Sequence, residues 1–121
     1  VMTDGKWLEF ILGQFMANSM KYASAERELV MSVSAEETED KVLLHFRDNG
    51  IGIPDSDLPR IFDKSFTGEN GRSYARSTGM GLYIVKSLCE RLEHSISVKS
   101  EQGSYTEFTI GFPKNNYFKM L

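Results

Sequence analysis

Four short segments with strand-like patterns constrain the fold of this 121-residue chain more than any other feature. Residues 29–34 and 41–47 are rich in β-forming side chains and are joined by an acidic connection at 36–40. Residues 95–100 and 106–112 alternate apolar and polar side chains across a short turn that contains glycine. Two hairpins of this kind predict a mixed but mostly antiparallel sheet.

Two further segments have the apolar spacing of amphipathic helices. Asp4 is suited to cap the first, which we expect to end near Ser24, and the second covers residues 82–92. A shorter helix is expected around 58–63. Helices packed on one face of such a sheet form an α+β two-layer sandwich. Because no linker, repeat or charge block divides the sequence, we expect residues 1–121 to form a single domain.

The composition excludes several classes of protein. With 40% hydrophobic and 26% charged residues, the chain is typical of a soluble globular domain. A net charge of -3 gives no general attraction to nucleic acid or to an anionic membrane. No apolar run approaches the roughly 20 residues that span a bilayer. Cys89, the only cysteine, lies among apolar residues at helical spacing, which predicts a buried thiol.

The first helix carries a polar stripe. Gln14, Asn18, Lys21 and Tyr22 are spaced so that all four lie on one helical face. Asn18 offers a neutral oxygen of the hard type that Mg²⁺ accepts, and Lys21 supplies a point charge suited to phosphate. The alternative is an ordinary solvated face of an amphipathic helix.

A second candidate site, Asp48-Asn49-Gly50-Ile51-Gly52-Ile53-Pro54, directly follows an apolar strand. A buried carboxylate here accepts a hydrogen bond from the exocyclic amine of adenine, whereas the carbonyl of guanine would repel it. The pattern therefore favours ATP over GTP. Gly50 and Gly52 allow the backbone to approach a planar base, although a plain strand-to-helix turn also contains such glycines.

A third candidate is the glycine-rich turn Ser77-Thr78-Gly79-Met80-Gly81-Leu82, which opens the second long helix. Free backbone N–H groups and the helix dipole favour phosphate at such a position. The turn fits neither the dinucleotide-binding fingerprint nor the phosphate loop that ends in Gly-Lys-Ser/Thr. The polar segment before it carries Arg72 and Arg76, which are suited to close over phosphates as a lid, although loop arginines are commonly only solvated.

The order of these segments resembles the GHKL superfamily of ATPases and kinases. Residues 18–22 are similar to its N box, 48–54 to its first glycine box, 61–66 to its phenylalanine box, and 77–82 to its second glycine box. The resemblance covers roughly residues 4–113. Four motifs in the right order make a chance match very unlikely.

Within that superfamily the chain most resembles histidine kinases of the short-sensor, intramembrane-sensing type from Gram-positive bacteria, because it has Trp7-Leu8 and Phe66-Thr67-Gly68. The resemblance implies the ATP-binding α/β sandwich, with ATP and Mg²⁺ as cofactors. It also implies a fragment of a longer membrane kinase, itself soluble and monomeric on the cytoplasmic side. The expected partners are the phosphoacceptor and dimerisation domain of the same kinase and, indirectly, a response regulator.

The resemblance also assigns roles by position. Asn18 would hold Mg²⁺, Lys21 would meet phosphate, Tyr22 would pack near the base, Asp48 would bind the adenine amine, and Thr106 would help to fix Asp48. The full nucleotide-binding set is Asn18, Lys21, Tyr22, Asp48, Asn49, Gly50, Gly52, Ile53, Arg72, Arg76, Thr78, Gly79, Met80, Gly81, Leu82 and Thr106. In the closing hairpin, Gly103-Ser104-Tyr105-Thr106 lacks the second glycine that the family often has.

Gln14 bears on the reaction, and we count it with Asn18 and Lys21 as a catalytic candidate. Hydrolytic members of the superfamily have a glutamate one turn before the magnesium asparagine, and an amide cannot replace it as general base. Gln14 therefore argues against efficient hydrolysis and favours phosphoryl transfer, unless it is merely solvated.

We do not expect either histidine to be the phosphoacceptor. His45 lies on the strand face opposite Val42, Leu44 and Phe46, and His94 follows the second long helix. The nucleophile is therefore expected on a separate domain. Two alternatives remain: a serine kinase of the anti-sigma type, and a GHKL module that binds nucleotide without transferring phosphate.

Overall fold

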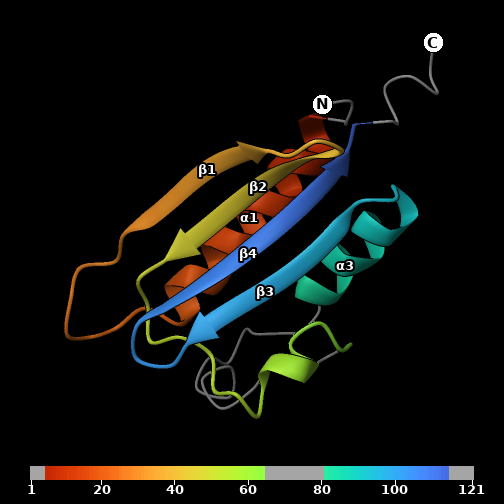
Figure 1. Ribbon diagram of the computed structural model, residues 1–121. Coiled ribbons are helices and arrows are strands. Elements are labelled where there is room, and N and C mark those ends of the chain that lie inside the picture. The colour runs from red at the N-terminus through yellow and green to blue at the C-terminus, as the bar shows by residue number, and fades with distance from the viewer. Residues whose placement is uncertain (1–4, 65–80, 115–121) are drawn as a thin grey trace.

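The computed structural model describes residues 5–64 and 81–114 of the chain (Figure 1). Each element predicted from the sequence within these ranges is confirmed to within a few residues. The short helix expected around 58–63 is a single 3-10 turn. In chain order the elements are α1 (Gly5–Lys21), β1 (Met31–Glu37), β2 (Lys41–Asp48), η1 (Leu58–Arg60), α3 (Gly81–Arg91), β3 (Ser95–Glu101) and β4 (Tyr105–Pro113).

The four described strands form one sheet in the order β1-β2-β4-β3. All the pairings between these strands are antiparallel, and the two predicted hairpins, β1 with β2 and β3 with β4, are confirmed. The central pair, β2 and β4, joins the hairpins and places Asp48 opposite Thr106. Figure 1 shows α1 and α3 together on one face of this sheet, which is the predicted two-layer arrangement.

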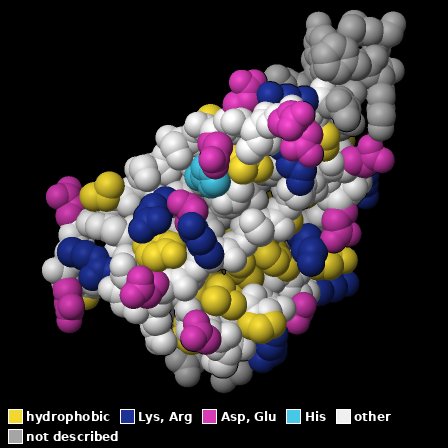
Figure 2. Space-filling model, viewed as in Figure 1, with side chains coloured by type: hydrophobic (Ala, Val, Ile, Leu, Met, Phe, Trp, Pro, Cys, Tyr) yellow, Lys and Arg dark blue, Asp and Glu magenta, His cyan; other side chains and the backbone are white. Residues whose placement is uncertain are grey.

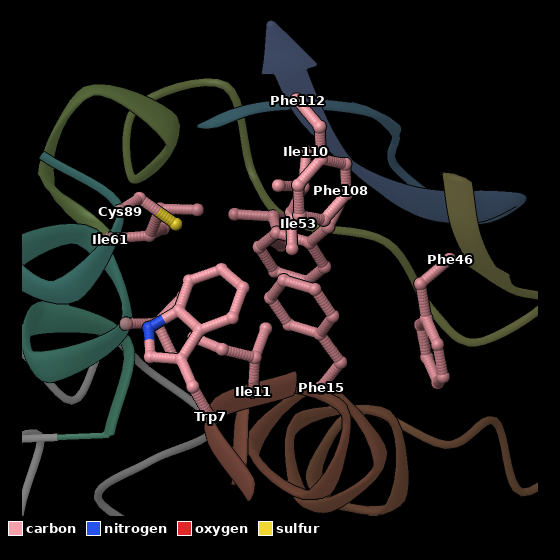
Figure 3. Close-up of a cluster of buried hydrophobic side chains, with 11 residues drawn as sticks. Trp7, Ile11, Phe15, Phe46, Ile53, Ile61, Cys89, Phe108, Ile110 and Phe112 are labelled. Carbon is pink, nitrogen blue, oxygen red and sulfur yellow. The ribbon is translucent and has the colours of Figure 1, made fainter. Parts of the chain in front are cut away.

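The core lies between α1 and the inner face of the sheet (Figure 3). Phe15 of α1 is 1% exposed and stacks on Phe108 of β4, with ring centroids 4.5 Å apart and an interplanar angle of 8°. The ring centroid of Phe46 of β2 lies 5.6 Å from that of Phe15. Burial of an aromatic side chain of this size contributes about 1.5–3 kcal/mol, so Phe15 is one of the main links between the two layers.

At the other end of α1, an aromatic cluster closes the core. The ring of His94 lies 5.2 Å from that of Trp7 and 4.7 Å from that of Phe112, in edge-to-face geometry in both cases. Burial lowers the pKa of His94, and the backbone of Glu93 offsets part of this shift. Cys89 is fully buried, as predicted, and burial raises its pKa to about 11. Neither side chain is placed for reaction with a solvent-borne partner.

The opposite face of the sheet is open and carries mixed charges (Figure 2). His45 lies there, as predicted, with Nε2 2.9 Å from Glu36 Oε1 and Nδ1 2.9 Å from the Thr109 hydroxyl. Glu107 lies between the cations of Arg47 and Lys99, at 3.6 and 3.5 Å. Ion pairs whose cations are exposed to solvent contribute little to stability, so this face chiefly keeps the sheet solvated. Across the described residues, neither helix has the length and hydropathy of a membrane-spanning segment.

Candidate functional site

The polar stripe that begins on α1 is buried at two of its four residues and half-buried at the other two. Asn18 is 9% exposed and Tyr22 is 5% exposed, while Gln14 and Lys21 are half-buried. Burial lowers the pKa of Lys21, whose ammonium lies 5.5 Å from the centre of the Tyr22 ring. A face of this kind is not the ordinary solvated surface that helical spacing alone allows.

Asn18 has an unpaired group that points to a missing ligand. Its amide nitrogen is buried, and within the described part of the chain it has no hydrogen-bond partner. Buried polar atoms are almost always paired, so a ligand oxygen is the natural partner. Among the described residues, no group of three or more acidic, histidine or cysteine side chains gathers to hold a metal ion. The oxygen of the same Asn18 amide is a ligand of the type that Mg²⁺ accepts, since this ion is usually held by one or two protein oxygens, with water and phosphate completing its shell.

Asp48 is the most deeply buried acidic group of the site. It is the last residue of β2 and is 2% exposed. Its Oδ2 accepts a 2.7 Å hydrogen bond from the Ser19 hydroxyl, and its Oδ1 accepts a 2.9 Å bond from the Gly50 N–H. A carboxylate has about four acceptor positions, so two remain for a ligand. Ser19 was not among our predicted site residues, although it lies one turn beyond Phe15 on the buried face of α1.

The glycine loop after Asp48 is held against α1 and the β3–β4 turn. The Ile51 N–H donates to the Tyr22 carbonyl at 2.8 Å, and the Gly103 N–H donates to the Ile51 carbonyl at 2.6 Å. A side chain at Gly50 would collide with the Tyr22 carbonyl oxygen, and one at Gly52 with the backbone of residues 101–102. The glycines therefore permit close approach of other parts of the chain, and approach of this backbone to a planar base stays a prediction.

Three other predicted residues of this region have neighbours within the protein. The Asn49 amide donates to the Glu28 carbonyl at 2.9 Å and accepts from the Val30 N–H at 2.8 Å, so it fastens the loop to the segment before β1. Ile53 is 1% exposed and belongs to the core. Thr106 is paired in register with Asp48, while its hydroxyl lies 3.2 Å from that of Ser100.

A cavity of about 250 Å³ adjoins the glycine loop. Its described lining consists of Tyr22, Ile51, Gly52, Pro54, Asp57, Gln102 and Gly103. Burial raises the pKa of the Tyr22 hydroxyl, and the charge of Asp57 adds to this shift. Neither Asp48 nor Asn18 belongs to this described lining, so the bonding of Asp48 identifies the site better than the cavity does.

Gln14, the first residue of the polar stripe, lies beside the beginning of α3. A side chain at Gly81, the first residue of α3, would collide with the Gln14 amide oxygen, so the two residues are in direct proximity. Leu82 follows and packs against the core. The other predicted residues of this region, Arg72, Arg76, Thr78, Gly79 and Met80, lie outside the described residues, as does the segment Phe66-Thr67-Gly68.

Comparison with known proteins identifies the family to which the chain is similar. The family described as histidine kinase-, DNA gyrase B- and HSP90-like ATPases matches residues 3–116. Among curated proteins, the sensor histidine kinase YxdK of Bacillus subtilis is 39% identical over 93% of the chain and 34% of its own length. The sensor protein BceS of the same organism is 42% identical over 98% of the chain and 35% of its own length. The chain thus spans about a third of the length of these relatives.

The solved structures show the same fold. The mycobacterial sensor histidine kinase MprB superimposes with a TM-score of 0.78 at 24% identity, over 93% of this chain and 76% of that one. Full-length ShkA in complex with AMPPNP gives a TM-score of 0.69 at 24% identity, over 87% of this chain and 21% of that one. These likenesses concern the fold, whereas the family match covers the predicted motifs. The chain belongs to the family of histidine kinase-, DNA gyrase B- and HSP90-like ATPases.

Proposed function

We propose that this chain is the ATP-binding catalytic domain of a sensor histidine kinase, and that Asp48 selects adenine. The observation that carries the proposal is the buried Asp48 carboxylate, held by Ser19 and Gly50 with acceptor capacity to spare. A fixed acceptor at this position matches the exocyclic amine of adenine. A guanine carbonyl facing the same oxygen would leave two acceptors opposed in a buried site.

The α1 stripe is suited to the phosphate end of the nucleotide. From the resemblance we assign the Asn18 amide oxygen to Mg²⁺, and its buried amide nitrogen, which lacks a partner among the described residues, is suited to donate to a phosphate oxygen. Bound Mg²⁺ would supply positive charge at the phosphate oxygens. Lys21 lies one turn further along α1 and would add a second cation. From the resemblance, Arg72, Arg76 and the turn from Thr78 to Leu82 are assigned to the phosphates as well.

Gln14 supports transfer to another group rather than to water. Its amide has no basic atom that could take a proton from water at neutral pH, and it lies beside Gly81 at the start of α3. The γ-phosphoryl would then persist until an imidazole from a separate phosphoacceptor and dimerisation domain arrives. His45 and His94 are unsuited to that role, because the first is bonded on the open sheet face and the second is buried. In the full protein we place this domain on the cytoplasmic side of the membrane, serving a response regulator.

Binding of nucleotides to the chain tests the first part of the proposal. Calorimetry with MgATP should give clearly tighter binding than MgGTP, and Asp48→Asn should weaken MgATP binding by about 10- to 100-fold, the value of one hydrogen bond to a charged group. Asn18→Ala should reduce the dependence of ATP affinity on Mg²⁺. Equal affinities for ATP and GTP, in protein with an unchanged circular dichroism spectrum, would remove Asp48 from its assigned role.

Phosphoryl transfer is tested with γ-labelled ATP. We expect no label on the isolated chain, and label on a histidine when the histidine-bearing hairpin expected in the full-length protein is added. Acid-stable label on serine of an added protein would instead favour the serine-kinase alternative. Label on the isolated chain would contradict our placement of the nucleophile in a separate domain.

A further inference from the structure

Arg27, between α1 and β1, is bound by backbone carbonyl groups from two other loops. Its Nε donates to the Asn49 carbonyl at 2.7 Å. One of its terminal nitrogens donates to the Gly50 carbonyl at 2.7 Å and to the Gly103 carbonyl at 3.0 Å. An ion pair between two exposed side chains is weak because both side chains must be ordered. Here the acceptors are backbone atoms that the fold already fixes, so only the arginine side chain has to be ordered. Hydrogen bonds from a guanidinium are charge-assisted and correspondingly strong.

One peptide group links Arg27 to Asp48. The carbonyl of the Asn49–Gly50 peptide accepts the Arg27 Nε–H, and the N–H of the same peptide donates to Asp48 Oδ1 at 2.9 Å. A cation at the oxygen of an amide and an anion at its N–H polarise the amide in the same direction. Bonds in such a chain strengthen one another. We therefore expect the guanidinium to strengthen this hydrogen bond, which is one of the two that hold the Asp48 carboxylate.

The remaining bonds of Arg27 hold the loop in place. In the next peptide, between Gly50 and Ile51, the carbonyl accepts a hydrogen bond from Arg27 and the N–H donates one to the Tyr22 carbonyl. The Gly103 N–H donates to the Ile51 carbonyl, and the Gly103 carbonyl accepts from Arg27. Arg27 thus closes a ring of bonds around the glycine loop, with α1 on one side and the β3–β4 turn on the other.

We propose that Arg27 is a positioning residue for nucleotide selection, acting through the Asn49–Gly50 peptide to hold the Asp48 carboxylate in the orientation that binds the adenine amine. This inference rests on the proposed adenine site at Asp48. Arg27 itself does not contact the base in this account. Its loss should therefore weaken only the part of the affinity that depends on the exocyclic amine.

The test compares two ligands in the parent chain and four variants. The ligands are ATP and purine riboside triphosphate, which lacks the exocyclic amine, and binding is measured by calorimetry with Mg²⁺. Arg27→Gln should weaken ATP binding about tenfold, which is the lower end of the effects seen when a residue that orients a metal ligand is changed. It should change binding of the analogue less than twofold. Arg27→Lys, which keeps the charge but not the fork of donors, should lose about threefold for ATP.

Arg47→Gln is the matched control. Arg47 immediately precedes Asp48 but lies on the open sheet face, with its guanidinium 3.9 Å from the centre of the Tyr105 ring. Its removal should leave both affinities unchanged. Equal weakening of both ligands by Arg27→Gln would show a merely structural role and overturn the proposal, as would no change for either ligand. If Arg27→Gln does not fold, the Arg27→Lys comparison decides, because loss for ATP alone supports the proposal and loss for both ligands or neither refutes it.

Asp48→Asn separates this inference from the proposed function. If that change weakens ATP binding while both Arg27 variants bind as well as the parent chain, the adenine site stands and Arg27 is not its positioning residue. If Asp48→Asn leaves ATP affinity unchanged, the adenine site itself is wrong. The Gly50 amide proton gives an independent spectroscopic readout, which should move upfield in Arg27→Gln and remain in place in Arg47→Gln.

Discussion

Replacing Gly52 by alanine should be among the most damaging single-methyl additions in this chain. Gly52 has φ 75°, a left-handed conformation that costs an L-residue about 1–2 kcal/mol. An added Cβ would also lie 2.9 Å from the Gln102 Cα and closer still to the Glu101 carbonyl oxygen. These neighbours are backbone atoms and cannot rotate away. Such overpacking typically costs about 1–3 kcal/mol, so the predicted loss of unfolding free energy is about 2–5 kcal/mol.

Two other glycines separate the two contributions. Gly103 has φ 88°, but within the described part of the chain an added Cβ would meet no atom within 4 Å. Gly103→Ala should therefore show the conformational cost alone, about 1–2 kcal/mol. Gly13 lies in the middle of α1, also with no described atom within 4 Å of an added Cβ. Gly13→Ala should stabilise the chain by about 0.5–1 kcal/mol, the gain in helix propensity.

Urea denaturation of the three variants and the parent chain, followed by circular dichroism, gives these free energies directly. We expect the order of stability to be Gly13→Ala, parent, Gly103→Ala, Gly52→Ala. If Gly52→Ala were no less stable than Gly103→Ala, the β3–β4 turn would not confine the glycine loop. Close packing of the turn on Gly52 would then not contribute to stability, whatever the nucleotide affinity.

Three further predictions concern buried groups. Ser19→Ala should lower the unfolding free energy by about 1.5–3 kcal/mol at pH 7, because the Asp48 carboxylate loses a buried donor; an unchanged urea midpoint would contradict this. Because the pKa of folded His94 lies below its usual value of 6.5, the stability it contributes is present above about pH 6.5 and is lost as pH falls through the lowered pKa. His94→Gln should flatten that slope in denaturation measured between pH 5 and 7.5, and an equally steep slope would count against the assignment. Cys89, with a pKa of about 11, should react with a thiol reagent at pH 7.5 only on unfolding, so rapid labelling of the folded chain would be the opposing result.

The fold could be predicted from the sequence because its elements depend on local patterns. The apolar spacing of α1 and the alternation in β3 and β4 can each be recognised within a short stretch of sequence, and the observed elements match them closely. The role of Arg27 was not visible in the same way. The acceptors described above lie 22 to 76 residues away in the sequence, and an arginine in a polar connection has no pattern that distinguishes it from a solvated one.

Asn49 shows a related difficulty. The sequence correctly predicted that Asn49 lies in the loop after β2. It did not show that the Asn49 side chain bonds to the segment before β1. Side-chain direction in a loop depends on which distant backbone groups lack partners, and that is decided only when the strands are paired. Thr106 shows both cases. Its contact with the Ser100 hydroxyl follows from the β3–β4 hairpin, in which the two residues are paired, whereas its register with Asp48 depends on how the two hairpins join.

Ser19 differs from these residues, because its contact with Asp48 follows from two periodicities already present in the sequence. Four residues along a helix advance about 6 Å, and two residues along a strand advance about 6.6 Å. Phe15 packs on Phe46, and both α1 and β2 run toward the glycine loop (Figure 1). One step further along each element leads from Phe15 to Ser19 and from Phe46 to Asp48, so the same alignment that forms the core brings the hydroxyl to the carboxylate. The site therefore lies where the apolar faces of helix and strand both end in a polar residue.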